Sequence, residues 1–364
     1  MARTTLVKDL LVFLAFFTHY AVSVGPPDSM TERFTGLGFL DSGVSGGLND
    51  MPRASYTMAQ RSWGMLPLPC YDTAVTNGYC DPHDIDVWDV TYGDCEVPKI
   101  FCRCISSPMS IDTLAADFGY KIPVKARQWI DTVSSYPAPE GGCSAWNGGD
   151  HLNFFGDCTD KMSVWFHEVA HSLDCWTTPR PPSLPEAFCY SDTPTEWSNI
   201  VLNGTCVPDN YAKADWAESW AQVAVMSAWH ANVGNVWNLG IGCMQAQMSK
   251  SIEQLAGLWP WVENATCDRW WDNDWEEICM GDVARDYGAC DGENTQDSSA
   301  RHGDGDNGGH NRQAVGKERS RTKGLPNDSD AWKKRKEGEL ARKLRAEERA
   351  GLRGRKTRSG GRRG

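Results

Sequence analysis

The stretch SVWFHEVAHSLDCW, residues 163–176, holds two of the chain's eight histidines, His167 and His171, four positions apart. Its apolar residues are too dense, and the stretch is too long, for a strand, so it predicts a buried helix. On a helix, positions i and i+4 lie about 40° apart, so the two imidazoles share one face at the separation that a single zinc ion requires. Glu168 projects to one side of this pair, where it can accept a proton from a zinc-bound water.

This H-E-x-x-H pattern predicts a zinc hydrolase. Zinc lowers the pKa of a bound water to about 7 and polarises a carbonyl group, so peptide hydrolysis is the natural chemistry. A core helix with two hydrogen-bonded histidines is the structural alternative, but a chance match in this chain has odds on the order of 1%. Because a catalytic zinc needs three protein ligands, the pattern also requires a third ligand elsewhere.

The residues that follow His171 do not supply the third ligand. The extended metzincin pattern requires Gly and then His or Asp at positions where this chain has Asp174 and Thr177. Residues 214–230 predict a second helix, and Glu218 lies within its otherwise apolar face. An unpaired carboxylate would be costly there, and metal ligation would explain it. Glu218 is therefore the predicted third ligand.

Two aspartates are weaker candidates for that ligand. Residues 203–211 loosely resemble the G-T-x-D-x-x-Y-G motif of the deuterolysin-like metallopeptidases, in which an aspartate is the third ligand. Asp209 follows Gly204 by five residues rather than three, and Tyr211 follows Asp209 by two rather than three, so the match fails in detail. Asp209 and Asp215 stay as alternatives to Glu218.

The order of motifs over residues 140–230 resembles that of the secreted fungal conidiation-specific protein family. A Phe-rich strand ending in Gly-Asp is followed by H-E-x-x-H-S-L-D and by a tyrosine seven residues before a glutamate. More distantly, the H-E-x-x-H-x-x-D and Y-x6-E-x2-A patterns resemble the catalytic domain of the anthrax lethal factor group of zinc metallopeptidases. This second resemblance implies three zinc ligands, His167, His171 and Glu218. It also implies that Glu168 is the general base and that Tyr211 supports the oxyanion.

Two further positions on these helices bear on the site. The lethal factor group usually has a second glutamate where this chain has Gln222, which puts a carboxylate role at that position in doubt but leaves the ligands untouched. Asp174 shares the helical face of His167 and His171, so it could accept the N–H of a ligating imidazole and fix its tautomer. A solvated helix residue is the alternative interpretation of Asp174.

The N-terminus predicts a secretory signal peptide over residues 1–23. Arg3 and Lys8 precede a short apolar run, and Ala21 and Ser23 follow at the spacing of a cleavage site. The run is much shorter than the roughly 20 residues that span a bilayer. We therefore expect a secreted protein, extracellular or in the cell wall, without a membrane span.

Cysteines and sequons agree with export. The fourteen cysteines predict a disulfide framework of up to seven bonds. We expect Cys102 and Cys104 to form disulfides in this framework rather than to bind a metal. Asn203, Asn264 and Asn327 each begin an N-glycosylation sequon, so we expect these asparagines to be exposed.

Composition changes sharply near residue 291. Residues 291–364 hold 20 Lys and Arg against 12 Asp and Glu, whereas residues 1–290 hold 16 against 36. The basic tail has too few apolar residues to offset the entropy of ordering, so we expect it to be disordered. It could bind polyanions weakly, although no specific nucleic-acid site is predicted.

The sequence thus predicts an α+β, disulfide-rich domain over residues 24–290 with a zincin-like arrangement. A small mixed sheet would pack on the HExxH helix and on a second, glutamate-bearing helix, and strand 151–155 would form its edge and pair with an extended substrate. The predicted function is a secreted zinc metalloendopeptidase of the gluzincin type, with a peptide or protein substrate. The alternative is a disulfide-rich surface, cell-wall or conidiation-associated protein with a zincin-like fold and little or no turnover.

Overall fold

The computed structural model describes residues 25–280 apart from residues 45, 53, 139, 179–188, 192–195 and 270–274, and it describes only the backbone of Thr76 and Tyr120. The predicted signal peptide, the sequon at Asn327 and the predicted disordered tail lie outside the described residues. Among the described helices, none has the length and apolar character needed to cross a membrane.

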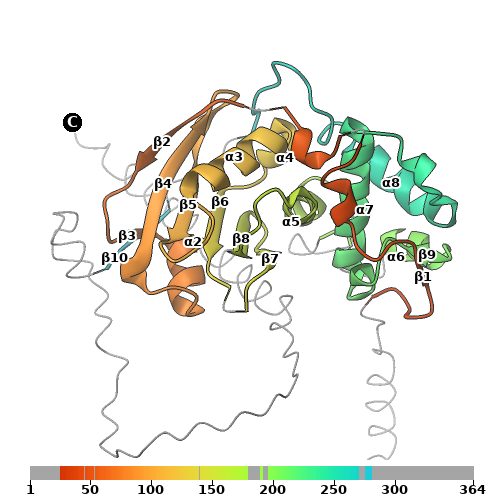
Figure 1. Ribbon diagram of the computed structural model, residues 1–364, viewed down its shortest axis with the longest axis horizontal. Coiled ribbons are helices and arrows are strands. Elements are labelled where there is room, and N and C mark those ends of the chain that lie inside the picture. Colours follow the sequence, from red (N-terminus) through yellow and green to blue (C-terminus); the bar gives the residue numbers. More distant parts are fainter. Residues whose placement is uncertain are drawn as a thin grey trace, which may run out of the picture.

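A six-stranded mixed sheet forms one side of the molecule (Figure 1). Its strand order is β2 (Tyr56–Gln60), β4 (Ile85–Tyr92), β5 (Cys95–Cys104), β6 (Thr132–Tyr136), β8 (His151–Gly156) and β7 (Cys143–Asn147). Strands β5, β6 and β8 are parallel, and the other neighbours are antiparallel. Two small sheets pair β1 (Thr31–Glu32) with β9 (Cys206–Val207) and β3 (Met65–Pro67) with β10 (Glu277–Cys279).

The predicted edge strand is wrong. Strand β8 covers the predicted residues but lies inside the sheet, between β6 and β7. The turn at residues 148–150, in which Gly149 has a φ of 90°, lets β7 fold back antiparallel on β8, and the Cys143–Cys158 disulfide holds the other end of the pair. A left-handed φ favours glycine, which explains the Gly-Gly pair in this turn. The strand at this edge of the sheet is therefore β7, and β2 lies at the opposite edge.

Helices cover both faces of the main sheet. Helices α3 (Ile111–Lys121), α4 (Val124–Arg127) and α5 (Met162–Trp176) share a core with Phe101, Val133 and Leu152, whereas α2 (Leu68–Tyr71) packs with the opposite-facing Ile100 and Cys102. Because successive strand residues point to opposite faces, these two clusters lie on opposite sides of the sheet.

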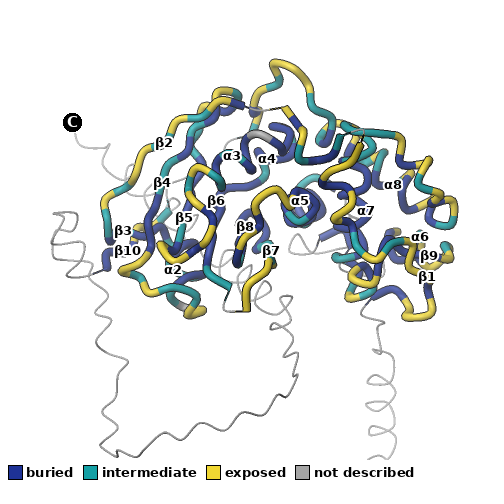
Figure 2. Tube along the Cα trace, viewed as in Figure 1, coloured by how far each residue is buried: buried dark blue, intermediate teal, exposed yellow. Residues whose placement is uncertain are grey.

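Helix α5 lies between the sheet and a second group of helices (Figure 1). That group contains α6 (Glu196–Leu202), α7 (Trp216–Asn232) and α8 (Gln245–Leu255). Both α5 and α7 are buried along most of their length (Figure 2). The two helices predicted from residues 163–176 and 214–230 are confirmed.

Six disulfides join the described residues: Cys70–Cys102, Cys80–Cys104, Cys95–Cys267, Cys143–Cys158, Cys175–Cys189 and Cys206–Cys243. Cys102 and Cys104 are bonded to different partners, as the sequence predicts. The mixed α+β architecture and the disulfide-rich framework are thus confirmed.

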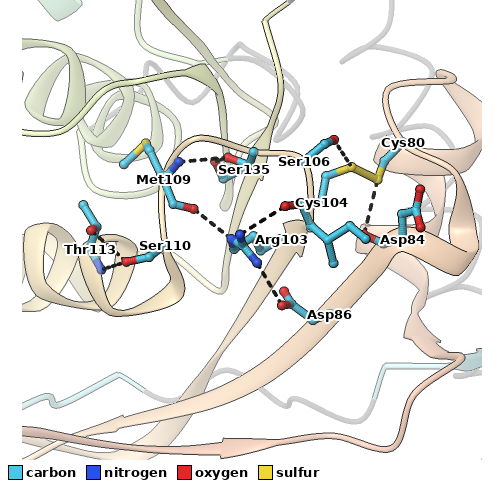
Figure 3. A network of polar contacts seen from close by, with 12 residues as sticks. Cys80, Asp84, Asp86, Arg103, Cys104, Ser106, Met109, Ser110, Thr113 and Ser135 are labelled. Carbon is cyan, nitrogen blue, oxygen red and sulfur yellow. Dashed lines mark hydrogen bonds and ion pairs between the residues drawn. A yellow bond between two sulfur atoms is a disulfide. The ribbon is translucent and has the colours of Figure 1, made fainter.

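The end of β5 is fixed by an arginine as well as by disulfides. Arg103 donates hydrogen bonds to the carbonyl groups of Met109 and Ile105, at 2.8 and 3.2 Å, and to Asp86 on β4 at 3.1 Å (Figure 3). These contacts tie two neighbouring strands to the loop that leads into α3. Because the charge-assisted bonds are partly buried, they hold this loop against the sheet.

The N-terminus of α5 is capped by a residue from a distant part of the chain. Lys161, the residue before the helix, makes no capping hydrogen bond. Instead, the buried carboxylate of Asp41 accepts hydrogen bonds from the backbone N–H and the hydroxyl of Ser163, at 2.5 and 3.0 Å. A negative charge at a helix N-terminus is also favoured by the helix dipole. Asp41 therefore fixes where the HExxH helix begins.

Replacing Asp41 should loosen this helix. We expect Asp41→Ala to lower the free energy of unfolding by about 1–2 kcal/mol, because two donors in the first turn lose their acceptor. Asp41→Asn keeps one carbonyl acceptor and should lose less. The exposed Glu96→Ala on β5 is the control and should change stability by less than about 0.5 kcal/mol. Urea unfolding measures all three, and equal stability of Asp41→Ala and Glu96→Ala would contradict the capping role.

Candidate metal centre

Three side chains meet where α5 crosses α7. Nε2 of His167 lies 2.7 Å from Oε2 of Glu218 and 3.1 Å from Nε2 of His171, and the Glu218 oxygen lies 3.5 Å from His171 Nε2. The two histidines lie one turn apart on α5, and the carboxylate comes from the first turn of α7. The structure thus brings together the three residues predicted as metal ligands.

The donor set and its dimensions fit a zinc ion. Zinc prefers imidazole nitrogen and carboxylate oxygen at about 2.0–2.2 Å, which puts tetrahedral donors roughly 3.3 Å apart. The three separations in this triangle bracket that value. The second candidate cluster in the described residues, Asp174 with Cys175 and Cys189, offers no thiolate because the two cysteines form a disulfide.

The triangle strongly favours positive charge. Burial disfavours the imidazolium of His171, but the attraction of the Glu218 carboxylate outweighs burial and raises the pKa of His171 to about 10. Burial likewise opposes the charge of Glu218, yet the two histidines hold the pKa of this carboxyl far below its usual range. A cluster that stabilises an added proton so firmly offers the same electrostatic stabilisation to a metal cation.

Glu168, the predicted general base, is buried beside the triangle, with 4% of its surface exposed. Its backbone is held by Asn147 at the end of β7. The Asn147 amide donates to the carbonyl oxygen of Glu168 at 2.5 Å and to the hydroxyl of Ser172 at 2.7 Å. The edge strand is therefore fixed to the turn of α5 that carries the predicted base.

Tyr211 lies at the open side of the cluster. It exposes 51% of its surface, and its ring centroid is 5.5 Å from that of His167. Partial burial and the nearby carboxylates of Glu218 and Glu168 together raise the pKa of Tyr211. The phenol therefore stays protonated and able to donate a hydrogen bond, as its predicted role requires.

The carboxylates of the two weaker ligand candidates are engaged in other hydrogen bonds. Asp215 is the N-cap of α7, and its carboxylate accepts the N–H of Glu218 at 2.7 Å. Asp209 accepts the N–H of Ala212 at 3.1 Å and the side-chain amide of Gln222 at 2.9 Å. Burial raises the pKa of both aspartates. Gln222 thus holds a carboxylate in place instead of supplying one.

Asp174 is buried at the C-terminal end of α5. Its oxygens accept hydrogen bonds from the hydroxyl and the backbone N–H of Ser191, at 2.5 and 3.2 Å. These bonds, together with the neighbouring Cys175–Cys189 disulfide, fasten the end of the helix. Its role in orienting an imidazole stays a prediction.

Two residues that position the site, Asp41 and Asn147, were not predicted from the sequence, and a third, Asp215, was considered only as a metal ligand. Only Asp215 has a local signal, because Asp-Trp-Ala-Glu at residues 215–218 matches the spacing of a helix capping box. The other two act across the fold, and no pattern near them in the sequence points to α5.

The two sequons that the structure describes are both accessible. Asn203 follows the last residue of α6, and Asn264 lies in a turn after α8; both are exposed. The predicted exposure of these asparagines is confirmed.

Comparison with known proteins gives one family. The family model described as "Conidiation-specific protein Con-13" matches residues 32–321. A curated relative, "Conidiation-specific protein 13" of Neurospora crassa, is 41% identical over 279 residues, which cover 77% of this chain and 79% of the relative. No solved structure matches the chain.

The identity of the third ligand can be tested by metal content. We expect protein that has been loaded with zinc and dialysed to keep one zinc per chain, and Glu218→Ala to lose it, since two ligands bind far more weakly than three. Asp209→Ala and Asp215→Ala should keep the metal, because their carboxylates serve as backbone caps. Elemental mass spectrometry measures the ratio. Zinc retained by Glu218→Ala but lost from either aspartate variant would contradict the assignment.

Proposed function

This chain belongs to the Con-13 family of conidiation-specific proteins, and we propose that it is a secreted, zinc-dependent metalloendopeptidase. The observation that carries the proposal is the triangle of His167, His171 and Glu218 with Glu168 buried beside it. A core helix would gain nothing from turning two imidazoles and a carboxylate toward one point. A metal site requires that convergence.

Zinc held by the triangle would supply Lewis-acid chemistry, polarising the scissile carbonyl and lowering the pKa of a water to about 7. Glu168 is the residue that accepts the proton of the attacking water and passes it to the leaving amine. Its position supports this role, because it directly follows His167 on α5 and a general base must lie within reach of the proton that it accepts. Asn147 keeps this turn of the helix in register with the edge strand.

Tyr211 is proposed to stabilise the oxyanion. Its hydroxyl group lies near the carboxylates of the site, it is protonated at neutral pH, and its ring is partly open to solvent. A donor in this position interacts with charge that develops only in the transition state, so it acts mainly on kcat.

We propose that strand β7 receives the substrate as an added strand. It pairs with β8 on one side and ends the main sheet, and Asn147 at its end contacts the turn of Glu168. An extended peptide that pairs with such an edge gains backbone hydrogen bonds independent of its sequence. The acidic balance of residues 1–290 would favour peptides that carry positive charge.

The proposed general base has a direct test. We expect Glu168→Gln to lower kcat for peptide cleavage by at least about 100-fold while one zinc per chain stays bound, because the amide cannot accept the proton. The exposed Glu253→Gln on α8 makes the same chemical change away from the site and should leave cleavage unchanged. Chelation of zinc should abolish cleavage by the native protein.

The peptidase proposal fails if the native protein binds zinc but cleaves no peptide, and if Glu168→Gln changes nothing measurable. The alternative would then hold: a disulfide-rich surface or cell-wall protein of the conidiation family that keeps a zincin-like site without turnover. The six disulfides among its described residues and its family favour that second candidate.

The charge preference can be measured separately. We expect kcat/KM for a basic peptide to exceed that for a neutral peptide of the same length at low salt, since the acidic domain attracts cations. Raising the ionic strength to about 1 M shortens the Debye length to about 3 Å and should remove most of this advantage. A ratio of the two kcat/KM values that is the same at low and high salt would contradict the electrostatic preference.

A further inference from the structure

A cleft of about 390 Å³ lies away from the metal centre, between the β4–β5 turn, α4 and the segment after α8. Its volume falls within the range of small-ligand sites, which is about 300–1,000 Å³. The lining includes the indole of Trp261, the polar side chains of Ser55 and Asp94, and both Asn264 and Thr266. The last two are the first and third residues of a glycosylation sequon, so the sequon itself forms one wall of the cleft.

The local backbone places the indole and the asparagine together. Trp261 stands three residues before Asn264, and a turn between them is closed by a hydrogen bond from the N–H of Ala265 to the carbonyl of Val262 at 3.2 Å. Asn264 adopts a left-handed φ of 61°, which asparagine tolerates better than most residues. The turn thus presents both side chains to one cleft.

Both ends of this segment are held in place. The backbone N–H of Trp261 donates to the side chain of Asn232 at 2.8 Å, and that side chain also donates to the carbonyl groups of Ala228 and Trp259. At the other end, Cys267 forms a disulfide with Cys95 and donates its N–H to Asp94. The wall that carries the sequon is therefore rigid, and a group attached to Asn264 would meet a preformed surface.

We propose that this cleft seats the first N-acetylglucosamine of an N-glycan carried by Asn264. The apolar C–H face of the sugar would pack on the partly exposed indole of Trp261, and its polar groups would face Ser55 and Asp94. The proposal rests on export through the secretory route but is independent of the peptidase activity. The glycan would then stabilise the folded protein through its contacts with the cleft.

The attachment is a transfer from a lipid-linked oligosaccharide diphosphate. A bond forms between Nδ2 of Asn264 and C1 of the sugar, the amide nitrogen loses one proton, and the lipid diphosphate leaves with the bonding electrons. Asn264 and Thr266 are both exposed, so the acceptor amide and the hydroxyl of the sequon are accessible. The lipid carrier and the transferase belong to the secretory pathway and supply the co-reactant.

The second described sequon provides a matched control. Asn203 lies at the end of α6, is also exposed, and has Ile200 rather than an aromatic residue three positions before it. It is not among the residues that line the cleft. A glycan on Asn203 therefore lacks the aromatic contact that is proposed for Asn264.

The experiment uses the full chain secreted from a fungal host. Peptide mass spectrometry first tests whether Asn264 carries a glycan, and an endoglycosidase then trims the glycan to its first sugar. We expect the trimmed protein to keep the Tm of the native glycoprotein. Thr266→Ala abolishes the sequon but keeps Asn264 in its left-handed conformation, and it should lower Tm by about 2–4 °C. Thr205→Ala, which abolishes the sequon of Asn203, should leave Tm unchanged.

A second comparison tests the contact with the indole. In a Trp261→Leu background, which keeps apolar bulk without the aromatic face, removal of the Asn264 glycan should change Tm by less than half of that amount. An unmodified Asn264 in the secreted protein would overturn the proposal. So would a Tm that is equal with and without the glycan while Trp261 is intact, or a loss of Tm that is just as large in the Trp261→Leu background.

Discussion

The 2.7 Å contact between His167 and Glu218 is the constraint on which the arrangement of the helices depends. It joins α5 and α7 across a buried interface, where an imidazole and a carboxylate are stable only with a shared positive charge between them. Hydrogen bonds from three further residues keep His167 and Glu218 in this position. Asp41 caps the start of α5, Asn147 fixes its middle to the sheet, and Asp215 caps the first turn of α7.

The disulfides give this arrangement its frame. The Cys143–Cys158 disulfide closes the β7–β8 pair, and the Cys175–Cys189 disulfide fastens the end of α5. Together they limit how far the edge strand and the HExxH helix can move apart. The proposed chemistry requires that rigidity, because a general base must stay within hydrogen-bond reach of the water that it deprotonates. The chain that carries this candidate centre belongs to the Con-13 family of conidiation-specific proteins.

The sequence predicted the parts of the site that have local patterns. The apolar density of residues 163–176 predicted α5, the H-E-x-x-H spacing predicted two converging imidazoles, and the lone carboxylate in an apolar face predicted Glu218. Strand 151–155 was wrongly placed at the edge although the Asn-Gly-Gly-Asp turn before it is a local hairpin signal for its pairing with β7. The order of the other strands could not be predicted, because pairing between distant strands leaves no local signal. The capping of α5 by Asp41 depends on the same long-range folding and was missed for the same reason.

The zinc site can be tested most directly by X-ray absorption spectroscopy at the zinc edge of the zinc-loaded protein. We expect nitrogen and oxygen ligands at about 2.0–2.2 Å with the outer-shell pattern of two imidazoles, as His167, His171 and Glu218 would give. A shell of sulfur at about 2.3 Å, or a spectrum of hydrated zinc without imidazole, would contradict it.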